Sequence, residues 1–160
     1  MFTVRLIEPR DDAVIEKIIR SCLLEYGGNR PGTAWYDEGL AHFSEVYKAE
    51  GSRYWVCEEE SGRVVGGVGI GGFPEREGVC ELQKMYCIPE VRGKGAAHLL
   101  MREALAYASE RYSLIFLDTF SNMLAARRFY EKYGFRESDT HPVDTGHFGC
   151  DVLMTLQLKK

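Results

Sequence analysis

The sequence predicts an α/β domain with a mixed, largely antiparallel central sheet and helices on its faces. Three extended stretches follow one another between Tyr54 and Ile88 with turn residues between them, which is typical of antiparallel strands. Stretches with helical spacing precede and follow these strands. The chain has 160 residues and no internal repeat or linker, so we expect residues 1–160 to form a single domain.

The N-terminal part predicts one strand and two helices. Thr3 to Glu8 alternate as a strand, and Asp11 and Asp12 then offer carboxylates that can cap a helix. The apolar side of this helix carries Val14, Ile15, Ile18, Ile19 and Cys22. A second helical pattern follows the loop at 27–32 and ends at Gly51. Its apolar residues are Leu40, Phe43, Val46 and Tyr47.

Turn residues divide the rest of the chain into further strands and helices. Ser61-Gly62 separates strands at 54–58 and 64–70, and Glu77-Gly78 precedes a third strand at 79–88. A helix follows from Ala97, with Leu100, Met101, Ala104, Leu105 and Ala108 at helical spacing. The prediction ends with a short buried strand at 114–117, a helix at 125–133 that Gly134 terminates, and strands from Phe135 and at 150–158.

Composition and charge exclude several classes of protein. No apolar run is long enough to span a bilayer, and the N-terminus does not resemble a signal peptide, so we expect a cytoplasmic protein with no membrane partner. The net charge of -4 gives no long-range attraction for nucleic acid, which we therefore exclude as a partner. The five cysteines include no C-x-x-C pair, so we expect reduced, mostly buried thiols.

The stretch Glu90-Val91-Arg92-Gly93-Lys94-Gly95-Ala96-Ala97 lies between a predicted strand and a predicted helix. The first N–H groups of a helix have no acceptor within the helix and lie at the positive end of its dipole, so they can bind phosphate. Small residues let an anion reach them, and a pyrophosphate fits this stretch. The alternative is that Gly93 and Gly95 only relax a tight turn. A P-loop is excluded, because Gly95 rather than Ser or Thr follows Lys94.

A second glycine-rich stretch, Gly67-Val68-Gly69-Ile70-Gly71-Gly72, has the spacing of a dinucleotide-binding motif. Phe73-Pro74 follows it instead of a helix, so the structural context of that motif is absent. We interpret the stretch as a glycine-rich strand.

Two motifs together resemble the GNAT (Gcn5-related N-acetyltransferase) superfamily. Arg92-Gly93-Lys94-Gly95-Ala96-Ala97 is similar to the family signature Q/R-x-x-G-x-G/A, and residues 82–89 precede it as the family's fourth strand precedes the signature. Residues 125–135 are similar to the family's A-x-x-x-Y-x-x-x-G-F segment. The resemblance extends over the whole chain in element order, and its sequence-specific part covers about 81–135.

The resemblance implies a GNAT-like sheet and transfer of an acetyl group from acetyl-CoA, as a co-substrate, to a primary amine of a small molecule or peptide. The amine would attack directly in a ternary complex, without a metal. The backbone of Met85, Tyr86 and Cys87 would hold the acetyl carbonyl and the pantetheine arm. The pyrophosphate would lie at Gly93, Lys94, Gly95, Ala96, Ala97 and His98, with Arg92 at the loop. Met123 stands where the family often has an Asn, and Asn122 is one residue away.

The implied chemistry needs two proton transfers. An alkylammonium, with a pKa of about 10, must lose a proton before it attacks, and the departing thiolate must gain one. The resemblance implies Tyr130 as the acid for the thiolate and Glu81 as a base that acts through a water. The alternatives are a core aromatic residue at position 130 and an exposed strand residue at position 81.

The acceptor site is the least defined part of the prediction. The resemblance places it near the first helices and their connecting loop, with Tyr26, Arg30, Trp35 and Tyr36, and near His147 in the last hairpin. We expect no metal, because the spacing of His141, His147, Cys150 and Asp151 fits no common ligand pattern. The alternative function is a non-catalytic acyl-CoA-binding regulatory module, and a homodimer is left open.

Overall fold

The computed structural model describes residues 1–158 of the chain. Its strands are β1 (Phe2–Leu6), β2 (Arg53–Glu59), β3 (Val64–Gly72), β4 (Val79–Cys87), β5 (Leu114–Thr119), β6 (Arg136–Ser138) and β7 (Val152–Gln157). Its α-helices are α1 (Asp12–Glu25), α2 (Phe43–Val46), α3 (Ala96–Arg111) and α4 (Leu124–Lys132). Its short 3-10 helices are η1 (Pro9–Asp11), η2 (Ala34–Tyr36) and η3 (Pro89–Val91).

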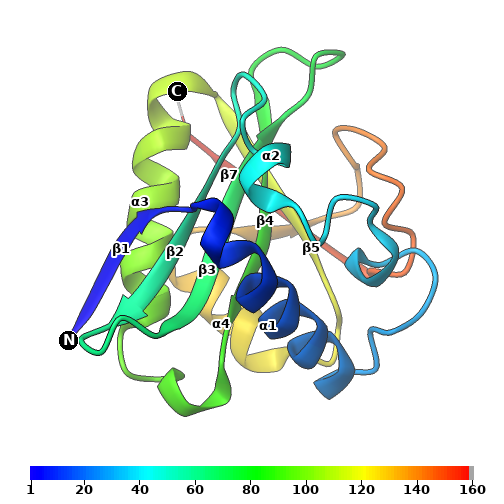
Figure 1. The fold of residues 1–160 in the computed structure, drawn as a ribbon. Helices are drawn as coiled ribbons and strands as arrows, with labels where there is room; N and C mark the ends of the chain where they lie inside the picture. The colour runs from blue at the N-terminus through cyan, green and yellow to red at the C-terminus, as the bar shows by residue number, and fades with distance from the viewer. Residues whose placement is uncertain (159–160) are drawn as a thin grey trace.

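The strands form a single sheet in the order β1-β2-β3-β4-β5-β7-β6. β4 and β5 run parallel, and the other neighbouring strands of the described chain run antiparallel. α1 crosses one face of the sheet and α3 covers the other (Figure 1). The predicted fold class, a mixed and largely antiparallel sheet flanked by helices, is therefore confirmed.

The core consists of a main layer on each face of the sheet. On one face lie the buried residues of α3, whose predicted helical spacing places Leu100, Met101, Ala104 and Ala108 against the strands. On the other face, the apolar side of α1 packs against Phe43, Tyr47 and Tyr54. Burial of these side chains is the main favourable contribution to folding, at about 25 cal/mol per Å² of apolar surface.

β3 is the glycine-rich strand that the sequence predicts, and aromatic rings explain its composition. A Cβ on Gly67 would lie 2.6 Å from the ring of Tyr54, and a Cβ on Gly69 would lie 2.8 Å from Tyr47. Rings of β2 and of the segment after α2 therefore occupy the space that side chains on β3 would fill.

Several predicted boundaries are wrong in detail. β1 ends at Leu6 rather than Glu8, because Pro9 begins η1. The second helix contains only Phe43–Val46, since turns such as the hydrogen bond from the His42 N–H to the Gly39 carbonyl keep the preceding residues from joining it. The last two strands are also shorter than predicted, and residues 139–151 form the loop between them.

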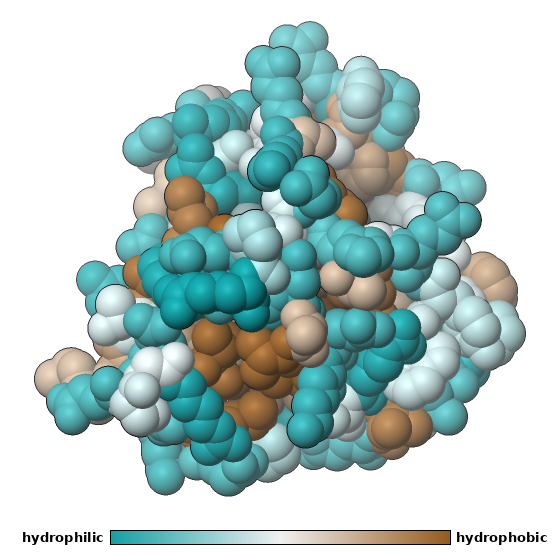
Figure 2. Space-filling view, in the orientation of Figure 1, coloured by the Kyte–Doolittle hydropathy of each residue, from teal (hydrophilic) through white to brown (hydrophobic). Residues whose placement is uncertain are grey.

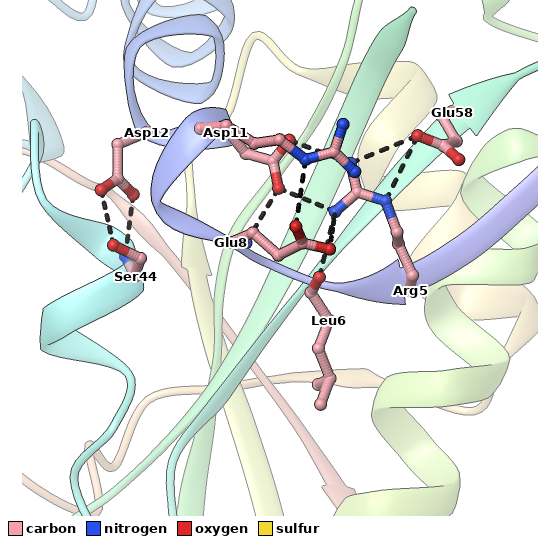
Figure 3. Close-up of polar contacts among 8 residues, drawn as sticks. Arg5, Leu6, Glu8, Asp11, Asp12, Ser44 and Glu58 are labelled. Atoms are coloured by element: carbon pink, nitrogen blue, oxygen red, sulfur yellow. Dashed lines mark hydrogen bonds and ion pairs between the residues drawn. The ribbon is translucent and has the colours of Figure 1, made fainter. Parts of the chain in front are cut away.

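Asp11 and Asp12 do not cap α1 with their side chains, contrary to the prediction. The Asp11 carboxylate accepts a hydrogen bond from the backbone N–H of Glu8 at 2.8 Å (Figure 3). The Asp12 carboxylate accepts two from Ser44, one from its N–H at 2.8 Å and one from its hydroxyl at 2.6 Å. Both carboxylates therefore connect the start of α1 to other segments.

Arg5 joins β1 and β2 to the turn before α1 (Figure 3). Its guanidinium lies 2.8 Å from the Asp11 carboxylate and 3.2 Å from that of Glu58. Burial opposes the ionisation of Asp11, but hydrogen bonds from Arg5 and the Glu8 amide outweigh it and hold the pKa of Asp11 below its usual value. Asp11 is thus a buried carboxylate whose charge Arg5 balances.

Charged and polar side chains cover most of the face that carries α1, and apolar residues show in a patch beside that helix (Figure 2). Four of the five cysteines are buried, as predicted, and all five are unpaired in this structure. Among residues 1–158, no helix is long and apolar enough to cross a membrane.

We predict that Arg5→Met lowers the free energy of unfolding by about 2–3 kcal/mol at neutral pH, because it leaves the buried Asp11 charge without its partner. Since the pKa of Asp11 is depressed in the folded state, this contribution exists above the usual carboxylate pKa and is lost as pH falls. Urea unfolding at pH 7 and pH 3 measures the effect. Arg10→Met is the control, because the Arg10 side chain is 64% exposed. Equal midpoints for the two variants would contradict the prediction.

Candidate active site

β4 and β5 are paired at one end and separate at the other. The register pairs Val79 with Leu114 and ends where Glu81 pairs with Phe116. Beyond this point the strands diverge (Figure 1), and the later residues of β4 pair with β3 alone in the described chain. Backbone N–H and C=O groups on the β5 side of β4 are therefore available to an extended ligand.

β4 contains a bulge within the divergent stretch. Two of its residues, Lys84 and Met85, lie opposite Val68 of β3. Lys84 has a φ of 51°, in the left-handed region that side chains other than glycine seldom adopt. Neighbouring residues of a regular strand point to opposite faces, yet Gln83 and Lys84 line the same cavity. The bulge therefore turns Lys84 toward the face on which Gln83 lies.

A cleft of about 210 Å³ lies between β4, α4 and the glycine loop. Predicted cofactor residues that line it are Met85, Tyr86, Cys87, Arg92, Gly93 and Ala97. Tyr130 and Phe129 of α4 form the opposite wall. The structure therefore brings together the β4 residues, the beginning of the glycine loop and Tyr130. Lys94, Gly95, Ala96 and His98 lie farther along the loop and in the first turn of α3.

The glycine loop has the features that an anion site needs. Gly93 and Gly95 have φ values of 78° and 99°, and a Cβ on either would meet no described atom within 4 Å. Backbone conformation, rather than crowding by the protein, therefore requires glycine at both positions. The N–H groups of residues 96–98, in the first turn of α3, have no acceptor in the described chain. They remain available to an anion at the positive end of the helix.

Arg92 and His98 hold the walls of the cleft together. Arg92 Nη1 lies 2.7 Å from the Glu25 carboxylate of α1, and its Nε donates to the Cys87 carbonyl at 3.2 Å. The hydrogen bond from Arg92 lowers the pKa of Glu25. His98 Nδ1 lies 2.7 Å from the Tyr133 hydroxyl, which joins α3 to α4. These contacts fix the loop between three helices.

Tyr130 is buried, with 8% of its surface exposed. Besides the cleft, it lines a cavity of about 40 Å³ in the opening between β4 and β5. Its hydroxyl has no hydrogen-bond partner in the described chain, and burial raises its pKa well above the usual value. The hydroxyl therefore stays protonated at neutral pH and is free to donate. The core-aromatic alternative is also partly true, because the ring packs against Phe135.

Met123 and Asn122 lie at the entrance of α4. Met123 lines both the cleft and the small cavity, and its sulfur accepts a hydrogen bond from the Thr119 hydroxyl at 3.5 Å. Asn122 instead donates to the Tyr26 carbonyl at 3.3 Å, outside both cavities. A thioether thus occupies the position where the resemblance implies an amide.

Glu81 lines a second cavity, of about 430 Å³, on the face of the sheet that carries α2. Its exposed fraction is 5%, so the alternative of an exposed strand residue is wrong. Gln83 Nε2 donates to Glu81 Oε1 at 2.7 Å, and the Tyr47 hydroxyl donates to Gln83 Oε1 at 2.7 Å. Burial raises the pKa of Glu81, while Lys84 and the hydrogen bond from Gln83 act in the opposite direction. The raised pKa makes Glu81 a stronger base than an exposed carboxylate.

Asp37 and Lys84 also line this second cavity, and the sequence did not predict either of them as a site residue. Lys84 Nζ lies 3.0 Å from Asp37 Oδ2, and His147 Nε2 donates to Asp37 Oδ1 at 2.9 Å. The three residues come from β4, from the segment after η2 and from the β6–β7 loop. No motif or spacing could have joined them, because two of the three lie in irregular segments.

The residues predicted for the acceptor lie in different places. Tyr26 lines the cleft with Met85. Arg30 donates to the carbonyls of Gly27 and Gly149 and lies over the ring of Phe120. Trp35 packs under the guanidinium of Arg20 on α1. Arg30 and Trp35 therefore hold loops together, and a contact with the acceptor stays a prediction for all three.

Comparison with known proteins identifies the family. The model of the acetyltransferase (GNAT) family matches residues 15–135. The uncharacterized N-acetyltransferase YjgM of Escherichia coli K12 is 37% identical over 158 residues, which cover 97% of this chain and 94% of YjgM. The chain therefore belongs to the GNAT family, and the predicted class of enzyme, a GNAT-type N-acetyltransferase, is confirmed.

Solved structures of acetyltransferases share the fold. A GNAT-family acetyltransferase from Staphylococcus aureus Mu50 has a TM-score of 0.85 at 18% identity, over 99% of this chain and 100% of that one. YncA, a putative acetyltransferase from Salmonella typhimurium solved with its cofactor acetyl-CoA, has a TM-score of 0.77 at 23% identity, over 99% of this chain and 95% of that one. At these identities the likeness concerns the fold.

Proposed function

We propose that the protein transfers an acetyl group from acetyl-CoA to a primary amine of a small molecule or peptide, by direct attack while both are bound. The observation that carries the proposal is the opening between β4 and β5. On its α4 side lie the cleft and Tyr130, and on its α2 side lies the cavity of Glu81. Lys84 borders both the small cavity that contains Tyr130 and the cavity of Glu81, so donor and acceptor can meet there.

The residues present fit acetyl-CoA. The narrow cleft has mainly apolar walls, which suit a pantetheine arm, and the free edge of β4 can pair with the amides of that arm. The unpaired N–H groups of α3 suit the pyrophosphate. A bound acetyl-CoA supplies a thioester whose acetyl carbon is open to attack by an amine. The acetyl-CoA complex of YncA, which has the same fold, supports this choice of donor.

Two side chains move protons in the proposed reaction. Glu81 attracts the ammonium form of the acceptor and takes its proton through a water. The amine nitrogen then forms a bond to the acetyl carbon, the carbon–sulfur bond breaks, and the nitrogen loses its second proton to solvent. Tyr130 gives its proton to the departing thiolate, so that free CoA leaves as the thiol, and Tyr130 then regains a proton from solvent. The two groups lie in different cavities, which keeps the acid apart from the base.

Release of free CoA tests the proposal. The purified protein is incubated with acetyl-CoA and a panel of amines that includes polyamines, aminoglycosides, amino acids and peptides, and thiol formation is followed. Amine-dependent release is expected for at least one acceptor. An acyl-CoA-binding module would bind the cofactor without any release, and that result would overturn the proposal.

We predict that Gly95→Glu abolishes CoA binding. The φ of 99° disfavours any side chain, and a carboxylate at the start of α3 repels the pyrophosphate. Calorimetric titration with CoA measures the loss. Gly62→Glu is the matched control, because Gly62 has a φ of 88° and equally open space but lies in the β2–β3 turn. Unchanged affinity of a folded Gly95→Glu variant would remove the pyrophosphate assignment.

Tyr130→Phe should lower turnover by about two orders of magnitude or more while CoA affinity changes little, because the variant keeps the ring and loses the proton donor. Steady-state kinetics with the best amine and a CoA titration measure the two effects. Tyr107→Phe is the control, since Tyr107 is also 8% exposed but packs against Trp55 on α3's side of the sheet. Full activity of Tyr130→Phe would leave this tyrosine as a packing residue.

Glu81→Gln should lower turnover about a hundredfold to ten-thousandfold near neutral pH, because the amide cannot accept the proton. Turnover should partly recover as pH rises, since more of the acceptor amine then arrives deprotonated. CoA affinity should not change. The measurement is a pH–rate profile of both proteins, and superimposable profiles would show that another group takes the proton.

A further inference from the structure

A buried carboxylate accepts a proton at neutral pH only if it is ionised there. Glu81 is 5% exposed, and burial favours its neutral form because the charged form loses hydration. The one hydrogen bond that it accepts in the described chain comes from the neutral amide of Gln83. This bond satisfies an oxygen atom but brings no opposite charge. Something else in the cavity must stabilise the negative charge.

The bulge of β4 brings a cation to this cavity. In a regular strand, residue 84 would point to the same face as Leu82, which packs in the core on the α3 side. With its φ of 51°, Lys84 instead lines the cavity of Glu81, and its side chain is 10% exposed. A bulge that re-aims a side chain beside a reaction site has a backbone cost, which a function at that site would explain.

Asp37 and His147 hold the Lys84 ammonium in the cavity. Asp37 Oδ2 lies 3.0 Å from Lys84 Nζ, and its Oδ1 accepts from His147 Nε2 at 2.9 Å. Burial opposes the ionisation of Asp37, but His147 and Lys84 outweigh it and hold the pKa of Asp37 below its usual value. The lysine is therefore tethered at a fixed place rather than free in solvent.

Other ionisable groups face Glu81 from each neighbouring element. They are Asp37 after η2, Tyr47 after α2, Glu75 between β3 and β4, Asp118 on β5, and Asp144 and His147 between β6 and β7. The acids among them add negative potential, and Asp118 in particular disfavours ionisation of Glu81. Among the described residues that line this cavity, Lys84 is the one lysine or arginine, and Lys84 and His147 both act to lower the pKa of Glu81.

We propose that Lys84 is a positioning residue whose tethered ammonium keeps Glu81 ionised at neutral pH and so allows it to act as the base. The inference rests on the proposed function for the role of Glu81. Neither the lysine nor its partner Asp37 needs to touch the reacting atoms.

The test is Lys84→Met, which keeps the length of the side chain and removes its charge. Without the ammonium the pKa of Glu81 rises. As the pH is lowered, the variant therefore loses activity at a higher pH than wild type does. We expect the acid limb of the kcat profile to move up by about one pH unit. The loss of turnover should approach about tenfold on the acid limb, at pH values below the wild-type inflection, with little change at pH 9. Lys84→Arg keeps the charge and should restore the wild-type limb.

Two controls separate this effect from a structural one. In a Glu81→Gln background, Lys84→Met should leave the acid limb where it is, because the group that Lys84 acts on is gone. Infrared titration of the Glu81 carboxyl, assigned by difference with Glu81→Gln, should show more of the protonated form at pH 7 in Lys84→Met. An equal loss of turnover at every pH, or an unchanged infrared titration, would overturn the inference. Absence of CoA release by wild type would refute the proposed function, while the infrared result would still decide the effect of Lys84 on Glu81.

Discussion

The point at which β4 and β5 stop pairing determines the rest of the site. The parallel ladder ends at Glu81 and Phe116, and from there β4 keeps its partner on one side only. A ladder continued to Cys87 would close the cleft, cover Tyr130 and remove the free backbone edge. The bulge at Lys84 lies within the same unpaired stretch, where a change of side-chain direction disturbs no second neighbour. Ligand access and the unusual direction of Lys84 therefore have a common structural origin.

The glycines of β3 leave space for two side chains of the second cavity. A Cβ on Gly71 would lie 2.6 Å from the amide of Gln83, and a Cβ on Gly69 would crowd the ring of Tyr47. These are the two side chains that connect in a hydrogen-bonded chain to Glu81. Residues 67–72, which have the spacing of a dinucleotide-binding motif, thus have a different structural role. Its missing side chains leave room for the polar groups that orient a buried carboxylate.

Local patterns in the sequence were enough to predict the elements with strong periodicity and the residues that line the cleft between β4 and α4. The apolar spacing of α1 and α3 and the turn residues of the β2–β3 hairpin correctly predicted their places, and two motifs located the cleft. In the second cavity, Glu81 and His147 were predicted, but Asp37 was not, because it is 110 residues from His147 and both lie in irregular loops. Asp11 shows the same limit, since a carboxylate at a helix start can bond to its own helix or, as here, to a distant arginine.

Burial has opposite consequences for the two groups proposed to move protons. Both are nearly inaccessible, and burial favours the neutral form of each. In the proposed reaction Tyr130 acts in its neutral form, so an apolar wall of aromatic residues is sufficient and no charged partner is required. For Glu81 the neutral form is inactive, so its surroundings must counteract burial. This difference explains why the Gln83 amide and a tethered cation lie near Glu81, whereas Tyr130 lies among Phe129, Phe135 and the thiol of Cys87.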